Sequence, residues 1–186
     1  MKRLVFIALA ILLVISTVDA KQVGDVILPD SLMAGQDFLL LNGAGFRKKI
    51  FIKVYAGGLY LKQKMSDARR IIDADEAMAI RMHFIYDGVS KEKLIDGWNE
   101  GFNNNTGGNI EPIKAEIEKF NAFFTEDARK NDVYDIIYVP GQGINVYIKG
   151  KQKGTVTGLD FKRAVFSIWL GEKPADASLK KKMLGE

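Results

Sequence analysis

The sequence predicts an α+β domain with a mainly antiparallel sheet and helices on one face. Segments with the two-residue hydrophobic period of strands occur in two groups, and two helical segments follow each group. Each of these helices has one apolar stripe and one polar face, so each can be covered by a sheet on one side. Strands and helices do not alternate singly, which disfavours a parallel α/β sheet.

The first twenty residues are expected to be a secretory signal peptide. A short basic start precedes an apolar run over residues 4–15, and small residues follow at Val18 and Ala20. A run of this length is too short to span a bilayer as a helix but suits a signal peptide. We therefore expect export and cleavage before Lys21; the alternative is an uncleaved membrane anchor.

The remaining residues, 21–186, are expected to form one domain. The sequence contains no cysteine, which excludes disulfides and thiolate metal sites, and export without disulfides suits a bacterial periplasm. Removal of the first twenty residues lowers the formal net charge from +4 to +3. The two basic clusters, residues 47–49 and 180–182, hold only three residues each, so nucleic-acid binding is not expected.

The first group of strands is predicted over residues 26–32, 38–41 and 50–61, which are rich in β-branched and aromatic residues. Residues 34–37 separate the first two strands. Residues 47–49, an arginine followed by two lysines, are predicted to form the turn between the last two. The last two strands would then form an antiparallel hairpin.

A short helix over residues 66–74 and an alternating strand over residues 78–86 come next. Ser90 is a good N-cap for a helix that ends at the Asn- and Gly-rich residues 103–108. The apolar residues of this helix fall on one side: Leu94, Ile95, Trp98 and Phe102. A second helix is predicted over residues 110–124, with apolar residues three and four apart.

The second group of strands is predicted over residues 134–139, 144–148 and 152–157. Two helices follow, the first expected to be capped by Asp160 and the second by Asp176. Both would present an apolar stripe to the sheet.

Several common chemistries lack the residues they need. His83 is the only histidine, so the sequence holds no His-rich metal site, and it has no G-x-S-x-G turn. The glycines at residues 43–45 lack the spacing of a phosphate-binding loop. Asp73 and Asp75 fit a solvated acidic turn better than an acid–base pair. We therefore expect no metal and no cofactor.

Five stretches resemble the chalcone isomerase-like family in its bacterial, secreted branch. They are GAGFR, FIKVYAGGLYL, KLIDGWNEGF, IEKFNAFF and FKRAVFSIWLGEKPADASLKKKMLG, which occur in the family's order between Gln36 and Gly185. The resemblance implies an open-faced β-sandwich: a large antiparallel sheet, helices on one face and a ligand cleft between them. The family contains enzymes that cyclise chalcones and relatives that bind fatty acids without catalysis.

The resemblance assigns Arg47 to the anion-binding arginine of this family, which holds an oxyanion in the enzymes and a fatty-acid carboxylate in the binders. A guanidinium suits both uses because it is permanently charged and donates two parallel hydrogen bonds. Tyr55 falls where the binders have tyrosine and the enzymes have threonine. The sequence pattern alone also allows a purely structural interpretation, in which Arg47 is a solvated turn residue and Tyr55 is a packed aromatic residue. Gly57 and Gly58 mark close approach by a ligand or by another backbone.

At other positions this sequence differs from the chalcone-cyclising enzymes. Their C-terminal hydroxyl maps to Ile168, although a shift of one residue would align Ser167 instead. Asn99 is the one plausible counterpart of their asparagine, and the helix from Ser90 has no tyrosine. These differences favour non-catalytic binding of a fatty acid or similar amphipathic carboxylate by Arg47, Tyr55 and Asn99. The alternatives are an isomerase or intramolecular lyase with an unidentified substrate, and an interaction module with a closed cleft.

Overall fold

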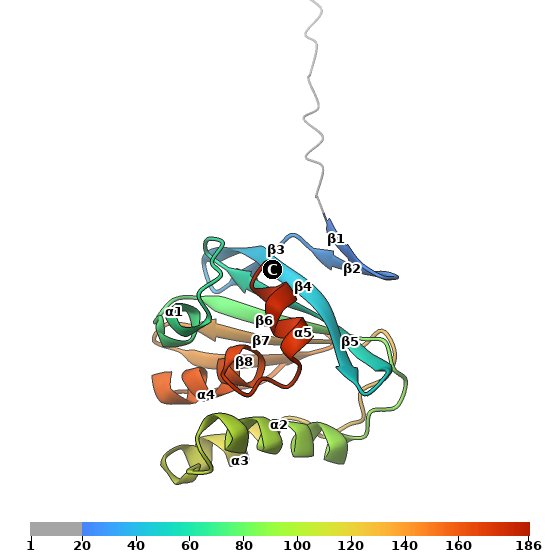
Figure 1. The fold of residues 1–186 in the computed structure, drawn as a ribbon. Coiled ribbons are helices and arrows are strands. Elements are labelled where there is room, and N and C mark those ends of the chain that lie inside the picture. Colours follow the sequence, from blue (N-terminus) through green and yellow to red (C-terminus); the bar gives the residue numbers. More distant parts are fainter. Residues whose placement is uncertain (1–19) are drawn as a thin grey trace, which may run out of the picture.

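A seven-stranded antiparallel sheet forms the centre of the computed structural model, which describes residues 20–186 (Figure 1). The strands follow one another in sequence order from β3 to β9, and a separate hairpin is formed by β1 and β2. The strands are β1 (Ala20–Val23), β2 (Val26–Pro29), β3 (Ser31–Ala34), β4 (Asp37–Lys49), β5 (Ile52–Leu61), β6 (Met78–Phe84), β7 (Val133–Val139), β8 (Gly143–Ile148) and β9 (Lys151–Val156).

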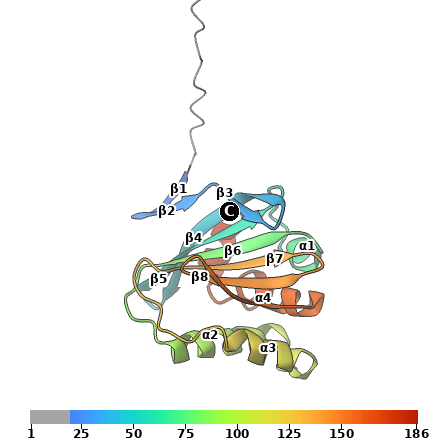
Figure 2. The same cartoon turned by 180° about the vertical axis from the view of Figure 1, so that it is seen from behind.

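The helices gather on one side of this sheet, and the β1–β2 hairpin lies at the other (Figures 1 and 2). They are α1 (Ala68–Asp73), α2 (Lys91–Asn105), the 3₁₀ helix η1 (Glu111–Ile113), α3 (Lys114–Asn121), α4 (Leu159–Leu170) and α5 (Ala177–Met183). The predicted α+β class with an antiparallel sheet and helices on one face is therefore confirmed. No helix within residues 20–186 is long and apolar enough to cross a membrane.

Alternation along the strands creates two cores, one on each face of the sheet. On β5, Leu59 and Leu61 belong to the larger core beneath the helices, whereas Tyr60 belongs to the smaller core with Val26 and Leu28 of the β1–β2 hairpin. The Tyr60 hydroxyl donates to the carbonyl of Pro29 at 2.9 Å, which ties the hairpin to the sheet. The two-residue period of strand side chains is the reason that one strand serves both cores.

Three local predictions were wrong. The strand predicted over residues 26–32 is two strands, because the chain turns at Asp30. β4 continues to Lys49 and the turn is Ile50–Phe51, so residues 47–49 are strand rather than turn. Helix α4 has Gly158 as its N-cap, and Asp160 instead pairs with Arg163 one turn later at 2.7 Å.

Other local predictions are confirmed. The Ser90 hydroxyl accepts a hydrogen bond from the Lys93 amide at the start of α2, and Asp176 accepts from two amides at the start of α5. The predicted signal peptide lies outside the described residues except for Ala20.

Glycines in β4 and β5 allow helix α5 to approach the sheet closely. A Cβ at Gly43 would lie 2.1 Å from the carbonyl oxygen of Lys182, and one at Gly57 would lie 2.9 Å from the Met183 side chain. At Gly57 the close neighbour is thus a side chain of α5 rather than another backbone.

Candidate functional site: a cavity between the β4–β5 hairpin and helix α2

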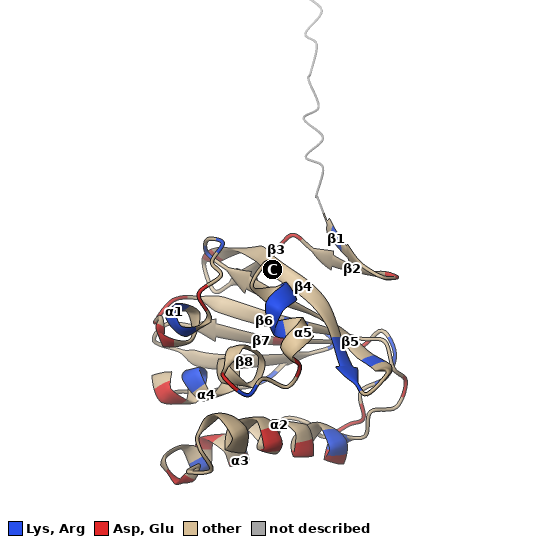
Figure 3. Ribbon diagram, in the orientation of Figure 1, with Lys and Arg blue, Asp and Glu red and all other residues tan. Residues whose placement is uncertain are grey.

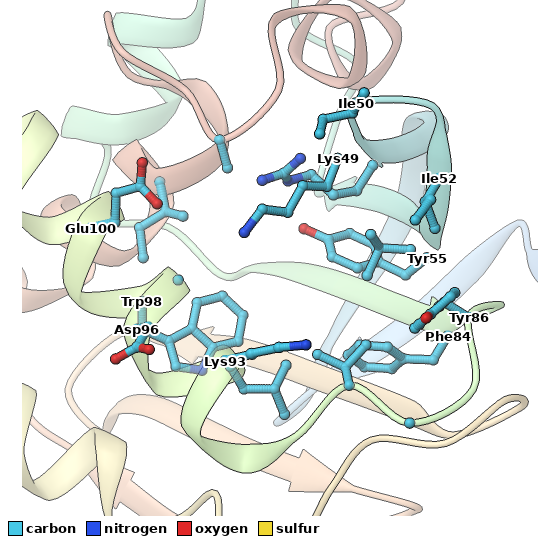
Figure 4. A pocket seen from close by; sticks show the side chains of 18 residues that line it. Lys49, Ile50, Ile52, Tyr55, Phe84, Tyr86, Lys93, Asp96, Trp98 and Glu100 are labelled. Atoms are coloured by element: carbon cyan, nitrogen blue, oxygen red, sulfur yellow. The ribbon is translucent and has the colours of Figure 1, made fainter.

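A cavity of about 500 Å³ lies between the β4–β5 hairpin and helix α2 (Figure 4). Its volume falls within the range of about 300–1,000 Å³ typical of small-molecule sites. Most of its wall is apolar and comes from strands, the loop before α2, α2 itself and α4. The apolar wall includes Val54, Phe84, Val89, Leu94, Trp98 and Ile168.

Arg47 and Tyr55 are paired residues on neighbouring strands and both line this cavity. The turn pairs Lys49 with Ile52, and a register shift between Lys48 and Arg47 then places Arg47 directly opposite Tyr55. Paired residues in an antiparallel sheet project from the same face, with their Cβ atoms about 5 Å apart. The register of the hairpin therefore places a guanidinium beside a phenol at the cavity.

The Tyr55 hydroxyl has a proton to donate. It accepts a hydrogen bond from Trp169 Nε1 at 2.9 Å in the buried layer between β5 and α4. An indole nitrogen only donates, so the tyrosine oxygen must be the acceptor in that bond and its own proton stays available to another group. Burial raises the Tyr55 pKa to about 12, against the opposing charge of Arg47. The hydroxyl is thus neutral and able to donate near neutral pH.

Arg47 is half-buried and keeps most of its donors available. Its guanidinium donates to the carbonyl of Lys48, and within residues 20–186 it forms no ion pair with a carboxylate. The neighbouring acid, Asp176, is occupied by amides: it accepts from Lys48, Ser178 and Leu179. A guanidinium carries five N–H donors, so Arg47 can bind an incoming anion without first breaking an ion pair.

The charged residues of the cavity are divided between its two sides. Lys49 lies on the hairpin side, whereas Asp96 and Glu100 lie on α2 (Figure 4). Lys93, at the start of α2, also lines the cavity. An anion would therefore be attracted by Arg47, Lys49 and Lys93 and repelled by Asp96 and Glu100 farther along α2.

The structure places the other predicted site residues away from the cavity or gives them no polar group there. Asn99 does not line the cavity; its side-chain oxygen accepts from Asn121 Nδ2 at 2.8 Å and links α2 to α3. Ile168 does line it, with an apolar side chain. The Ser167 hydroxyl donates to the carbonyl of Arg163 at 2.7 Å within α4, so this stretch presents no hydroxyl to the cavity.

Lys93 lines the cavity, although it was not among the site residues predicted from the sequence. Trp98, predicted on the apolar side of its helix, is both a core residue and a wall of the cavity, since it contacts Trp169 and Phe120 while lining the cavity. Its Nε1 is buried without an acceptor among the described residues. The apolar stripe of α2 identified the buried face of the helix. A stripe of this kind does not distinguish residues that pack in the core from residues that line a cavity.

Comparisons with known proteins agree with this fold. A model of the family described as chalcone isomerase-like matches residues 20–185. Fatty-acid-binding protein 1 of Arabidopsis thaliana is 23% identical over 176 residues, which cover 77% of this chain and 62% of that protein's length. A crystal structure of an Arabidopsis thaliana fatty-acid binding protein superposes with a TM-score of 0.71 at 19% identity, covering 89% of this chain and 96% of that one.

Proposed function

The chain belongs to the chalcone isomerase-like family, and on that premise we propose that it binds a fatty acid or a similar amphipathic carboxylate without catalysing a reaction. The observation that carries the proposal is the pairing of Arg47 with Tyr55 at one side of an apolar cavity. The similarity to a plant fatty-acid-binding protein supports it.

Each part of such a ligand meets a matching surface. The carboxylate would accept two hydrogen bonds from Arg47 and one from the neutral Tyr55 hydroxyl. The hydrocarbon chain would lie against Phe84, Leu94 and Trp98, where each buried CH₂ group contributes about 0.8 kcal/mol. An apolar site with a few polar groups that fix orientation is the usual design of a small-molecule site.

The resemblance assigns the chalcone isomerase enzymes a C-terminal hydroxyl that this cavity does not present. The loss of one preorganised donor from a transition state typically costs about 2.7–4 kcal/mol. Here Ile168 is apolar and the Ser167 hydroxyl is bonded within its own helix. We expect chalcone absorbance to fall no faster with the protein than without it. A turnover of about 1 s⁻¹, near the low end for enzymes, would contradict this expectation.

We further propose that the protein is exported as a member of the family's bacterial, secreted branch and works in the periplasm. The support is the short apolar run of residues 4–15, followed by small residues at Val18 and Ala20. Mass analysis of protein from the periplasmic fraction should give Lys21 as the first residue. Recovery of the intact chain, with Met1, in the membrane fraction would contradict the proposal.

The two tryptophans provide the test of ligand binding. Trp98 lines the cavity and Trp169 is bonded to Tyr55, so occupancy should change the intrinsic fluorescence. Titration with a long-chain fatty acid should saturate, and Arg47→Ala should weaken binding about thirtyfold or more because it leaves the carboxylate unpaired. Lys53→Ala is the matched control, since Lys53 lies on the same hairpin over the Phe46 ring and does not line the cavity. Binding by Arg47→Ala within threefold of wild type would refute the assignment.

A further inference from the structure

The tip of the β4–β5 hairpin exposes its apolar side chains. Phe51 is 93% exposed and Ile50 is 83% exposed, more than any other large hydrophobic residue among those described. Ile52, the next residue along, is 50% exposed. Three adjacent apolar residues at a loop tip lie outside both cores, so the folding of the domain does not explain them.

Local backbone preference does not explain them either. The turn contains only two residues, and Ile50 adopts a φ of 58°, in the left-handed region. A hairpin turn with positive φ at its first central residue normally has glycine there, and a β-branched residue is among the least suited to it. Ile50 and Phe51 therefore occupy a turn where smaller polar residues would make the protein more soluble and the backbone less strained.

Basic residues surround this apolar tip (Figure 3). Arg47, Lys48, Lys49 and Lys53 lie within four residues of the turn, and the chain contains no acidic residue between Asp37 and Asp67. Among residues 20–186, the side-chain carboxylate that accepts a hydrogen bond from the hairpin is that of Asp176, and its donor is the backbone amide of Lys48 rather than a lysine ammonium group. An apolar tip among cations matches the interface of an anionic lipid bilayer, where apolar side chains insert and lysines meet the headgroups.

We propose that residues 48–53 dock the protein on an anionic lipid bilayer. Lys49, Ile50 and Ile52 belong to the tip and also line the cavity, so docking would turn the mouth of the cavity toward the lipid (Figure 4). Tyr86, which is exposed and lines the same cavity, adds an aromatic side chain of the kind enriched at membrane interfaces. Docking rests on the hairpin alone; only the uptake of a ligand from the bilayer would rest on the proposed function.

The test is sedimentation with vesicles of phosphatidylcholine alone and of phosphatidylcholine mixed with phosphatidylglycerol. The protein used begins at Lys21, so that it retains both cores and lacks the apolar run of residues 4–15. It should bind the mixed vesicles, bind the neutral ones much more weakly, and dissociate as salt screens the headgroups. Lys48→Gln and Lys49→Gln should each weaken binding about fivefold.

The double variant Ile50→Gly with Phe51→Ser separates docking from folding. Glycine suits the positive φ, so thermal stability should be unchanged or higher, while vesicle binding should fall about tenfold or more. Phe38→Ser is the matched control: Phe38 is 57% exposed on β4 but lies away from the turn, and its loss should leave vesicle binding unchanged.

Three outcomes would overturn the proposal. The first is failure of the wild type to bind the mixed vesicles, and the second is equal vesicle binding by the wild type and the double variant. The third is a wild type that does not bind vesicles but forms a dimer in light scattering, where the double variant is a monomer. The last would make a second copy of this chain the partner of the tip. None of these outcomes bears on fatty-acid binding measured in solution, so the two proposals fail separately.

Discussion

Arg47 and Lys162 are two cations that differ in their burial and in the groups that surround them. Lys162, on α4, is 0% exposed, and its ammonium donates to the carbonyls of Ile71, Ile72 and Ala74 at 2.6–2.9 Å. Arg47 is half-buried and donates to one carbonyl, that of its neighbour Lys48.

The difference follows from what each cation meets. The ammonium group of Lys162 reaches the C-terminal end of α1. The last carbonyls of a helix lack partners within the helix, and this ammonium group donates hydrogen bonds to them. Arg47 lies at a cavity that has space for a further molecule. A buried charge is stable when its hydrogen bonds are complete, so Lys162 serves the fold. Arg47 keeps unused donors where a ligand can reach them, which is what a binding site requires.

The largest effect is expected from Lys162→Met. This change removes the donor from three carbonyls and should lower the free energy of unfolding by about 3 kcal/mol, as breaking a buried charged network does. Denaturant unfolding measures it. Fatty-acid affinity of the folded variant should stay within twofold of wild type; a large loss of affinity with unchanged stability would invert the roles assigned to the two cations.

The contribution of Lys162 to the free energy of unfolding should depend on pH. Burial lowers the Lys162 pKa to about 8 from an ordinary value of 10.5. Between these values the unfolded chain holds more protons at this position than the folded one, so raising the pH favours the folded state. The difference in unfolding free energy between wild type and Lys162→Met should therefore widen as pH rises from about 8 to 10.5. A difference that narrows would contradict the assigned environment.

Tyr55→Phe should lower ligand affinity by about 2 kcal/mol through the loss of a hydrogen bond to a charged group. The structure adds a cost, because Trp169 Nε1 would lose its acceptor. An unfolding free energy about 1 kcal/mol lower is now expected, and an affinity equal to that of wild type would remove Tyr55 from the site.

Gly97 offers a smaller and cleaner perturbation of the cavity. It lies within α2 and lines the cavity, and a Cβ added there would meet open space. Gly97→Ala should raise the free energy of unfolding by about 1 kcal/mol and leave affinity nearly unchanged. Gly97→Phe should place a ring in the cavity and weaken fatty-acid binding about tenfold. Equal affinity of the two variants would mean that the ligand does not enter this cavity.

Much of the fold could be predicted because it depends on local patterns. The change from the two-residue to the helical period located most strands and helices, and Ser90 and Asp176 identified two helix starts. The turn of the β4–β5 hairpin was misplaced because Ile50 and Phe51 resemble strand residues. A turn with a β-branched residue at positive φ carries no sequence signal.

The site was predicted less completely because its members come from distant parts of the chain. Arg47 and Tyr55 were identified through the family resemblance, and their pairing became clear only from the register. The Trp169 bond to Tyr55 joins residues 114 positions apart, which no local pattern reveals. Asn99 was chosen for its residue type, whereas the fold directs it toward Asn121.

The central claim, that Arg47 binds a carboxylate in this cavity, is tested most directly by comparing two head groups. Wild type and Arg47→Met should be titrated with a fatty acid and with the fatty alcohol of the same chain length. Wild type should prefer the acid by about thirtyfold or more, and Arg47→Met should bind both alike. A wild type that does not discriminate, or a preference for the acid that survives in Arg47→Met, would contradict the account.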